Sequence, residues 1–440
     1  NNDDGGFGEP GDQDIIKCDT YTGNGSNTGS KSVTLGFEPQ FIMIKRTDSS
    51  GNWVIVDNMR GMLVNGTSND TILQWNSTSN ESSLAESVLE PTATGFNLRS
   101  AGGDFNGNGA TYIYVAIRRG GMQTPTAASS VFEAVAYTGN GATGRAIGSI
   151  STTDLVLVDD LNNDSSISGR GACFFDRLRG ENALLMSQST DGDSNGWAND
   201  YFNLDQSGGW RSGDSDANFF NKSSSAYISW AWKRTRGYFD VVAYSGTGSN
   251  RTISHNLGVV PEMMWIKRRD STNNWAVYHK GLDSGNNPET HYLILNSTAA
   301  EDDVNEVFND TAPTSSVFSV GTASLVNNSS GTFIAYLFAT VAGVSKVGSF
   351  TQSGATNVDC GFTGDTPSFL ILKKTNSTGS WFTFDSARGL VAGNDKVLYL
   401  NSTSAQSDDS DVADPYSGGF ATTANLSDGD YIFYAVAATS

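Results

Sequence analysis

The sequence has little cysteine and no long apolar run. Its cysteines are Cys18, Cys173 and Cys360, and they stand at different places within the segments that repeat along the chain. A disulfide framework would recur with those segments, so we expect three free thiols on small buried or half-buried side chains. No stretch approaches the roughly 18 apolar residues of a membrane helix, so we expect no membrane insertion.

Basic side chains are also scarce. The 440 residues include 27 Lys and Arg against 47 Asp and Glu, which gives a formal net charge of -20. The summed field of such a chain repels phosphate backbones and anionic lipid surfaces. We therefore expect no nucleic-acid partner.

The residues that carry most enzyme chemistry are few and scattered. His255, His279 and His291 have no metal-ligand spacing. The sequence also lacks a glycine-rich phosphate loop, a nucleophile elbow and a paired cysteine motif. A pair of carboxylates that cleaves polysaccharide stays open, because sequence does not give the distance between them. We predict that the protein is not an enzyme.

Repetition is what the chain has in abundance. A segment of about 105 residues, close to the commonest domain size, occurs four times. Each copy opens with an aromatic-hydroxyl turn, at Tyr21-Thr22-Gly23, Tyr137-Thr138-Gly139, Tyr244-Ser245-Gly246 and Phe350-Thr351. Each closes with alternating aromatic and small apolar residues, beginning at Tyr112, Tyr227, Phe333 and Tyr431. Units this long can enclose their own cores, so we expect them to fold independently and sit like beads.

The predicted organisation has six parts. Residues 1–12 form a flexible or partner-ordered arm, and residues 120–130 form a linker. The repeats span residues 13–119, 131–236, 237–341 and 342–440, and the second has diverged. Each holds about eight to ten short strands between polar turns, without a helical period. This pattern predicts an all-β fold of four tandem antiparallel β-sandwich domains of jelly-roll or lectin-like type.

Inside a repeat, a continuous apolar strand suggests burial on both faces or at the centre of a sandwich. It ends in a lysine whose head we expect to be solvated, at Lys45, Lys267 and Lys373. The next strand begins with a tryptophan that suits core packing better than sugar stacking, at Trp53, Trp275 and Trp381. It ends in a predicted intradomain ion pair or turn cap, at Asp57 with Arg60, Asp176 with Arg179 and Asp385 with Arg388.

Two loops place oxygen donors at alternate positions before a glycine, like the first half of an EF-hand loop. Their donors are Asp104, Asn106 and Asn108 in one loop and Asp191, Asp193 and Asn195 in the other. Val115 and Phe202 stand where that motif has its bidentate glutamate. The six donors are candidate Ca²⁺ ligands, with chance occurrence in a chain rich in Asp and Asn as the alternative.

The repeated constellation of Y-T-G-N-G, L-G-x-x-P, an apolar strand ending in I-K-R, W-x-V-x-D and G-x-Y-I-x-Y-A resembles a tandem module of bacteriophage virion proteins. It is most similar to tail fibres of phages that infect marine cyanobacteria and other marine bacteria. The resemblance covers nearly the whole chain and implies a structural protein on the virion surface. A tail or head fibre of this kind is expected to be a homotrimer that contacts other virion proteins and adheres to host-surface glycans.

Two alternatives remain at this point. The chain could be a capsid decoration protein that coats the shell, or a secreted carbohydrate-binding or adhesin array. Because the copies share turn and core residues, recognition is expected in the loops that they do not share. These loops span residues 104–109, 191–216 and 404–411.

Overall fold

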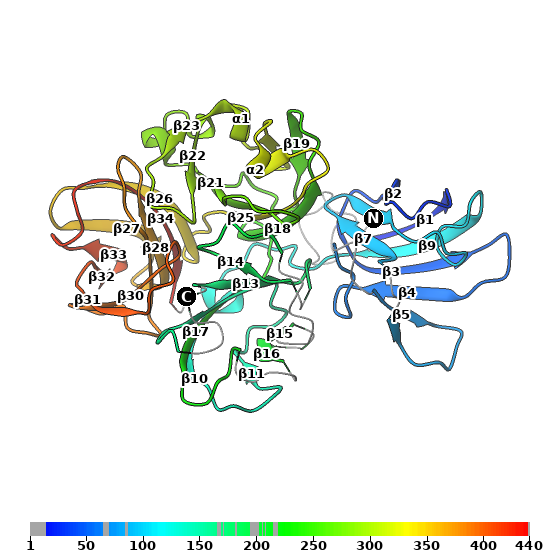
Figure 1. The fold of residues 1–440 in the computed structure, drawn as a ribbon, viewed down its shortest axis with the longest axis horizontal. Helices are drawn as coiled ribbons and strands as arrows, with labels where there is room; N and C mark the ends of the chain where they lie inside the picture. The colour runs from blue at the N-terminus through cyan, green and yellow to red at the C-terminus, as the bar shows by residue number, and fades with distance from the viewer. Residues whose placement is uncertain are drawn as a thin grey trace. The chain divides into compact units, whose positions relative to one another are not determined.

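The computed structural model describes residues 15–64, 70–83, 87–164, 169, 171–180, 183–193, 202–204, 206, 208–213 and 219–438. The chain is all-β, with 44% strand and 5% helix, as the sequence predicts (Figure 1). The helical segments are single turns: η1 (Ala128–Ser130), η2 (Leu282–Gly285), η3 (Pro288–Thr290), α1 (Asn305–Phe308) and α2 (Ser324–Asn327).

Every repeat contains one large antiparallel sheet in which the closing strand lies between the opening strand and the apolar strand. In repeat 1 the order is β1 (Ile16–Thr22), β9 (Thr111–Arg118), β3 (Pro39–Arg46), β4 (Trp53–Asp57), β5 (Thr71–Gln74) and β6 (Ser82–Ser83). In repeat 2 it is β10 (Phe132–Thr138), β17 (Ala226–Trp232), β12 (Leu155–Asp160), β13 (Cys173–Asp176) and β14 (Leu185–Met186). In repeat 3 it is β18 (Phe239–Ser245), β25 (Thr332–Phe338), β20 (Met263–Arg268), β21 (Ala276–His279), β22 (His291–Ile294) and β23 (Asp302–Asp303). In repeat 4 it is β26 (Ser345–Gln352), β34 (Gly429–Ala437), β28 (Pro367–Lys374), β29 (Trp381–Asp385), β30 (Asp395–Tyr399) and β31 (Ser407–Ser410).

A small sheet accompanies each large one. Its strands are β2 (Lys31–Thr34), β8 (Gly95–Leu98) and β7 (Leu89–Thr92) in repeat 1, and β11 (Ala146–Ile147), β16 (Trp210–Ser212) and β15 (Phe202–Asn203) in repeat 2. They are β19 (Arg251–Ser254) and β24 (Val317–Val320) in repeat 3, and β27 (Thr356–Phe362), β33 (Gly418–Thr422) and β32 (Ala413–Tyr416) in repeat 4. In repeat 1, Val33 and Phe96 of the small sheet share a buried cluster with Ile42 and Ile44 of the large one. The core therefore lies between two sheets, which is a sandwich.

The structure explains why each repeat opens with an aromatic residue. Tyr21 stacks on Tyr112, the first aromatic of the closing strand, with ring centroids 5.0 Å apart. Its hydroxyl donates to the carbonyl oxygen of Phe105 at 2.6 Å. The same stack recurs in the other repeats, at Tyr137 with Tyr227, Tyr244 with Phe333 and Phe350 with Tyr431. The opening and closing motifs are thus two halves of one core contact.

The glycine after this aromatic is required by close approach of the chain. A Cβ on Gly23 would lie 2.4 Å from the carbonyl oxygen of Gly107, and one on Gly246 would lie 2.1 Å from that of Asn328. No real Cβ tolerates such a distance from a backbone oxygen. The turn can therefore sit against its partner loop only when the side chain is absent.

The chain divides into two compact units. Unit 1 contains Asn1–Gln123, Arg177–Gly180 and Ser254–Asn256, and unit 2 contains Thr124–Asp176, Glu181–Ile253 and Leu257–Ser440. Unit 1 therefore holds the sandwich of repeat 1, whereas unit 2 holds the sheets of repeats 2, 3 and 4. The expectation of separate beads is wrong for these three repeats, because they share one compact body.

Candidate functional site

The apolar strand at the centre of each large sheet in unit 2 is buried on the outer face of the sheet as well. The outer face of a large sheet is the face turned away from its own small sheet. On β28, Leu370 and Leu372 point into the sandwich, so Phe369, Ile371 and Lys373 lie on the outer face. All of these outer-face side chains are buried, as are their equivalents on β12 and β20. The apolar strands of unit 2 are therefore covered on both faces, as their sequences indicate.

Hydrogen bonds join the three outer faces in a closed ring. The Tyr336 hydroxyl of repeat 3 donates to Asp176 Oδ2 of repeat 2 at 2.7 Å. The Trp230 indole of repeat 2 donates to Asp385 Oδ2 of repeat 4 at 2.9 Å. Repeat 4 meets repeat 3 where the Phe433 carbonyl oxygen lies 3.2 Å from His279 Nε2.

Two of these contacts use equivalent donors, and all three use the same position at the end of the strand after the apolar strand. Trp230 and Tyr336 are opposite the third residue of the apolar strand in their sheets, and Asp176, His279 and Asp385 all end the strand that follows it. Each repeat thus presents its closing strand to one neighbour and its Asp or His to the other. The three sheets are related by an approximate threefold arrangement.

Aromatic rings from all three repeats meet where the sheets converge. Trp232 lies 6.4 Å from Phe338 and 5.3 Å from Phe369, measured between ring centroids. Phe338 in turn lies 5.0 Å from Tyr434. Figure 1 shows β17, β25 and β34, the strands that carry most of these rings, near the middle of unit 2. Burial of such large apolar side chains contributes several kcal/mol of stabilisation, at roughly 1.5–3 kcal/mol for each.

Two tryptophans and two lysines reach across these interfaces. Trp275 Nε1 donates to the Met186 carbonyl oxygen of repeat 2 at 3.0 Å. Trp381 Nε1 donates to the Ile294 carbonyl oxygen of repeat 3 at 3.0 Å. Both indoles are buried, as expected for packing residues, whereas Trp53 in unit 1 is half-buried.

The expectation of solvated lysine heads is wrong in unit 2. Lys373 is buried, and its Nζ donates to the carbonyl oxygens of Thr298 at 3.1 Å and Ala299 at 2.8 Å in repeat 3. Lys267 is also buried and donates to the Thr190 carbonyl oxygen of repeat 2 at 3.0 Å. The sheet of the neighbouring repeat excludes water, and backbone carbonyls replace it as acceptors.

Two of the predicted ion pairs form, in repeats 1 and 4, and the second of them also bonds a neighbouring repeat. Arg60 Nε donates to Asp57 Oδ2 at 2.7 Å in unit 1, where both side chains are partly exposed. Arg388 Nε donates to Asp385 Oδ2 at 2.6 Å, where the two side chains are 1% and 0% exposed. Asp385 is also the acceptor for Trp230, and the sequence did not indicate this contact between repeats. The one signal available was that the position recurs as Asp, Asp, His and Asp.

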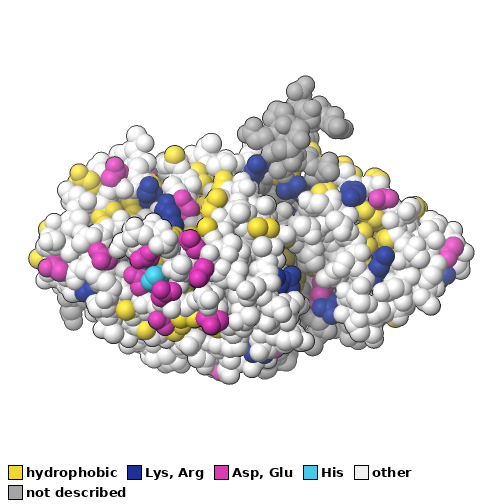
Figure 2. Space-filling model, turned by 90° about the horizontal axis from the view of Figure 1, so that it is seen from above, with side chains coloured by type: hydrophobic (Ala, Val, Ile, Leu, Met, Phe, Trp, Pro, Cys, Tyr) yellow, Lys and Arg dark blue, Asp and Glu magenta, His cyan; other side chains and the backbone are white. Residues whose placement is uncertain are grey.

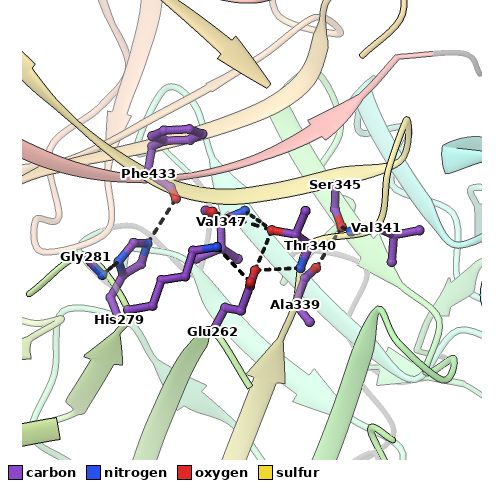
Figure 3. A network of polar contacts seen from close by, with 10 residues as sticks. Glu262, His279, Gly281, Ala339, Thr340, Val341, Ser345, Val347 and Phe433 are labelled. Carbon is purple, nitrogen blue, oxygen red and sulfur yellow. Dashed lines mark hydrogen bonds and ion pairs between the residues drawn. The ribbon is translucent and has the colours of Figure 1, made fainter. Parts of the chain in front are cut away.

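His279 replaces that aspartate in repeat 3 and is held in one tautomer (Figure 3). The backbone N–H of Gly281 donates to His279 Nδ1 at 2.9 Å, so the proton of the neutral ring lies on Nε2. That Nε2–H donates to the Phe433 carbonyl oxygen. Burial lowers the pKa of His279 to about 3. The histidine is therefore a neutral donor that joins repeat 3 to repeat 4.

Glu262 organises the neighbouring connection between repeats 3 and 4 (Figure 3). Its carboxylate accepts from Lys280 Nζ at 2.7 Å and from the Thr340 backbone N–H at 2.9 Å. The Thr340 hydroxyl also donates to this carboxylate and accepts from the Val347 backbone N–H at 3.1 Å. The short connection is thus fixed at both ends by side-chain bonds.

Three buried aspartates carry raised pKa values. Asp159 stands where repeats 3 and 4 have their buried lysines, and burial raises its pKa to about 7. Burial also raises the pKa values of Asp70 and Asp395 to about 6. Asp395 Oδ2 accepts the backbone N–H groups of Val412 at 3.0 Å and Ala413 at 2.9 Å. Asp70 likewise accepts the backbone N–H groups of Val88 and Leu89, so both carboxyls hold an adjoining segment of their own repeat.

The first candidate Ca²⁺ loop is used for contacts within the sandwich. Asp104 Oδ1 accepts the Asn52 backbone N–H at 3.1 Å. Asn106 is buried, accepts the Asn24 backbone N–H at 2.8 Å and donates to the Ser26 carbonyl oxygen at 2.8 Å. Asn108 is exposed. Asn221 and Asn327 make the same pair of backbone hydrogen bonds as Asn106 in their own repeats, so this pair of bonds is a feature of the fold.

In the second candidate loop, Asp191 accepts from the Ser189 hydroxyl at 2.8 Å, and Asp193 pairs with Arg269 at 2.8 Å. Asn195 lies outside the described residues. Within the part of the chain that the structure describes, no group of three or more His, Cys, Asp or Glu side chains could hold a metal ion. Ca²⁺ binding stays a prediction.

The cysteines are free, and two of them fit the expectation. Cys173 and Cys360 are buried, whereas Cys18 is exposed, so the expectation of burial is wrong for Cys18. Residues 404–411 also differ from the expected loop, because β31 occupies their centre.

Acidic side chains gather on the face that Figure 2 shows, over the part of unit 2 formed by repeat 3. Repeat 3 carries Glu289, Asp302, Asp303 and Glu306 on or beside η3, β23 and α1. The acidic side chains on this face give it a negative potential, which repels anions. No helix within the described residues is long and apolar enough to cross a membrane.

The chain belongs to the family described as Domain of unknown function (DUF7483), whose model matches residues 14–119 and 127–439. The two matched segments correspond to repeat 1 and to the three repeats of unit 2. No curated protein matches the chain.

Proposed function

We propose that the protein is a structural component of a bacteriophage particle, a tail or head fibre that adheres to host-surface glycans. The observation that carries this proposal is the use made of the recurrent polar residues. Asp176, His279 and Asp385 bond neighbouring repeats, and Lys267 and Lys373 do the same. Polar residues that are used in contacts between repeats stabilise the arrangement of the sheets, which is a structural role. The resemblance of the repeated motifs to phage fibre modules supports the same role.

The acidic surface and the free thiols suit a protein displayed on the outside of a particle. A net charge of -20 keeps such a surface soluble and prevents adsorption to the packaged nucleic acid. Other virion proteins would anchor the chain, and the loops that differ between repeats would contact glycans.

The position of the chain on a purified particle tests this proposal. We expect labelled antibody or a cryo-EM reconstruction to place it at a tail or vertex. Density spread over all capsid faces would identify a decoration protein instead. Recovery of the intact chain only from culture supernatant free of particles would contradict a virion role.

A glycan array probed with the full chain tests adhesion separately. We expect binding that is lost when the same preparation is heat-unfolded, because the loops need the sandwiches to hold their shape. Binding to no glycan would refute adhesion and leave a purely structural role.

A further inference from the structure

The outer face of the large sheet in unit 1 is apolar and open. Ile16 on β1 is 60% exposed and Ile113 on β9 is 37% exposed. Phe41 and Met43 on β3, together with Val115 on β9, are half-buried. Yet β3 is a continuous apolar strand of the kind that is covered on both faces. Its sequence therefore indicates a partner for this face.

The equivalent positions of this face are covered in the other three repeats. The strand registers make Ile113 equivalent to Ile228, Ile334 and Ile432, which are all buried. Ile16 is equivalent in the same way to Phe132, Phe239 and Ser345, which are also buried. What covers each of these faces is the equivalent face of two sister repeats.

Polar positions of repeat 1 match the ring as well. Lys45 is equivalent to Lys267 and Lys373, but its Nζ donates to the Gly51 carbonyl oxygen of its own hairpin at 2.8 Å. Lys373 makes the matching bond to its own hairpin, at Gly379, and adds two carbonyl oxygens of a sister repeat. Lys45 therefore makes the same bond to its own hairpin as Lys373, but within the described part of the chain it has no bond to a sister repeat.

The acceptor side of the interface is open too. Trp75 is 67% exposed, whereas Leu295 and Leu400, which make the equivalent backbone bond, are buried. Trp75 directly follows Gln74, whose equivalent, Ile294, accepts the indole N–H of the next repeat. The exposed Trp75 side chain is a large apolar area to leave in water.

We propose that this face binds the same face of repeat 1 in two further copies of the chain, giving a homotrimer with a closed ring like that of unit 2. Three copies are needed because each sheet has one donor side and one acceptor side, and the ring closes after three. The sister faces in unit 2 are already used, so repeat 1 of another copy is the occupant that remains. Lys45 and Trp53 of one copy would then donate to the carbonyl oxygens of Thr78 and Gln74 of the next.

The inference rests on the sheets alone and holds whether or not the chain is part of a virion. The mass of the purified full chain in solution tests it, by light scattering and sedimentation. We expect three times the chain mass of 46.7 kDa. A monomer, a dimer or a tetramer would overturn the proposal.

Ile113→Asp tests the surface. Ile113 is opposite Lys45 in the strand register, so the aspartate gains a cross-strand partner and the sandwich is expected to fold. We expect the mass to fall from three chains to one. The control is Val259→Asp, because Val259 is 38% exposed and belongs to unit 2, not to the sheet of repeat 1. If Ile113→Asp leaves the trimer intact, or if the control also dissociates it, the proposed surface is wrong.

Cys18 gives a second readout that needs no loss of structure. It lies on the same face, opposite Val115, and is exposed in the single chain, whereas Cys173 and Cys360 are buried. In the trimer we expect Cys18 to react slowly with a maleimide, and in Ile113→Asp we expect one rapidly reacting thiol. Ile16→Asp serves as a further variant if circular dichroism shows that Ile113→Asp does not fold. A rapidly reacting Cys18 in the unmodified protein would overturn the proposal.

Discussion

Asp385→Ala is the sharpest test of how unit 2 is held together, because one carboxylate supports two repeats. Asp385 Oδ1 accepts the Arg388 backbone N–H at 2.8 Å, and Oδ2 accepts Arg388 Nε at 2.6 Å and Trp230 Nε1 at 2.9 Å. The alanine removes all three acceptor contacts at once. It leaves a guanidinium that is 1% exposed and an indole N–H, both without this partner.

The size of the effect follows from burial. Breaking a buried ion pair by removing one partner costs roughly 3–5 kcal/mol, because the remaining charge is uncompensated. An orphaned buried donor such as the indole N–H costs a further ~1–3 kcal/mol. The two losses share one carboxylate and are not strictly additive. We therefore expect the free energy of unfolding of unit 2 to fall by at least roughly 4 kcal/mol.

Urea unfolding followed by tryptophan fluorescence measures this change. Asp408→Ala is the matched control in the same repeat, because Asp408 pairs with Lys396 at 3.2 Å and the Lys396 and Asp408 side chains are 42% and 59% exposed. Exposed pairs contribute only about 0–1 kcal/mol. Should the two variants lose similar stability, the buried contact between repeats 2 and 4 would not be a major support of unit 2.

Three further predictions concern other buried groups. Burial raises the pKa of Asp159 to about 7, above the unfolded value of roughly 3.9. The buried neutral carboxyl therefore contributes its full stabilisation below pH ~4, and this stabilisation is lost as the pH rises to ~7. Compared with Asp159→Asn, the unmodified protein should lose up to roughly 4 kcal/mol of unfolding free energy over that range; parallel pH profiles would contradict this. Lys373→Met should destabilise unit 2 by ~1–3 kcal/mol in urea, because buried carbonyl oxygens lose a donor, whereas the exposed Lys396→Met should change little. Gly246→Ala should lower the melting temperature clearly, because its Cβ would lie 2.1 Å from a backbone oxygen, whereas Gly103→Ala meets only a side-chain atom at 3.7 Å; equal shifts would refute the steric argument.

Much of each sandwich could be predicted from local sequence. The alternation in Tyr431-Ile432-Phe433-Tyr434 and the polar hairpins fix where strands begin and end, because strand periodicity and turn chemistry act over a few residues. The Asp385 and Arg388 pair was predictable for the same reason, since its partners are three residues apart. Repetition then allowed one repeat to confirm the pattern of the next.

The contacts between repeats could not be predicted in this way. In the sequence, Lys373 has the features of a charged residue at the end of a strand. Nothing near it indicates that its Nζ donates to the carbonyl oxygens of Thr298 and Ala299 in another repeat. His279 looks like an exception to an aspartate pattern, yet it fills the same role as a neutral donor. Partners that are about 75 to 155 residues apart leave no local signal.

The sequence by itself determined the strands, the repeats and the fact that apolar residues occupy both faces of the central strand. Only the tertiary structure decided what covers the outer face: sister repeats in unit 2, and open solvent in unit 1 of the single chain. The physical reason is that the apolar pattern of a strand shows which of its faces must be removed from water. Which surface covers that face depends on which sheets can pack against it.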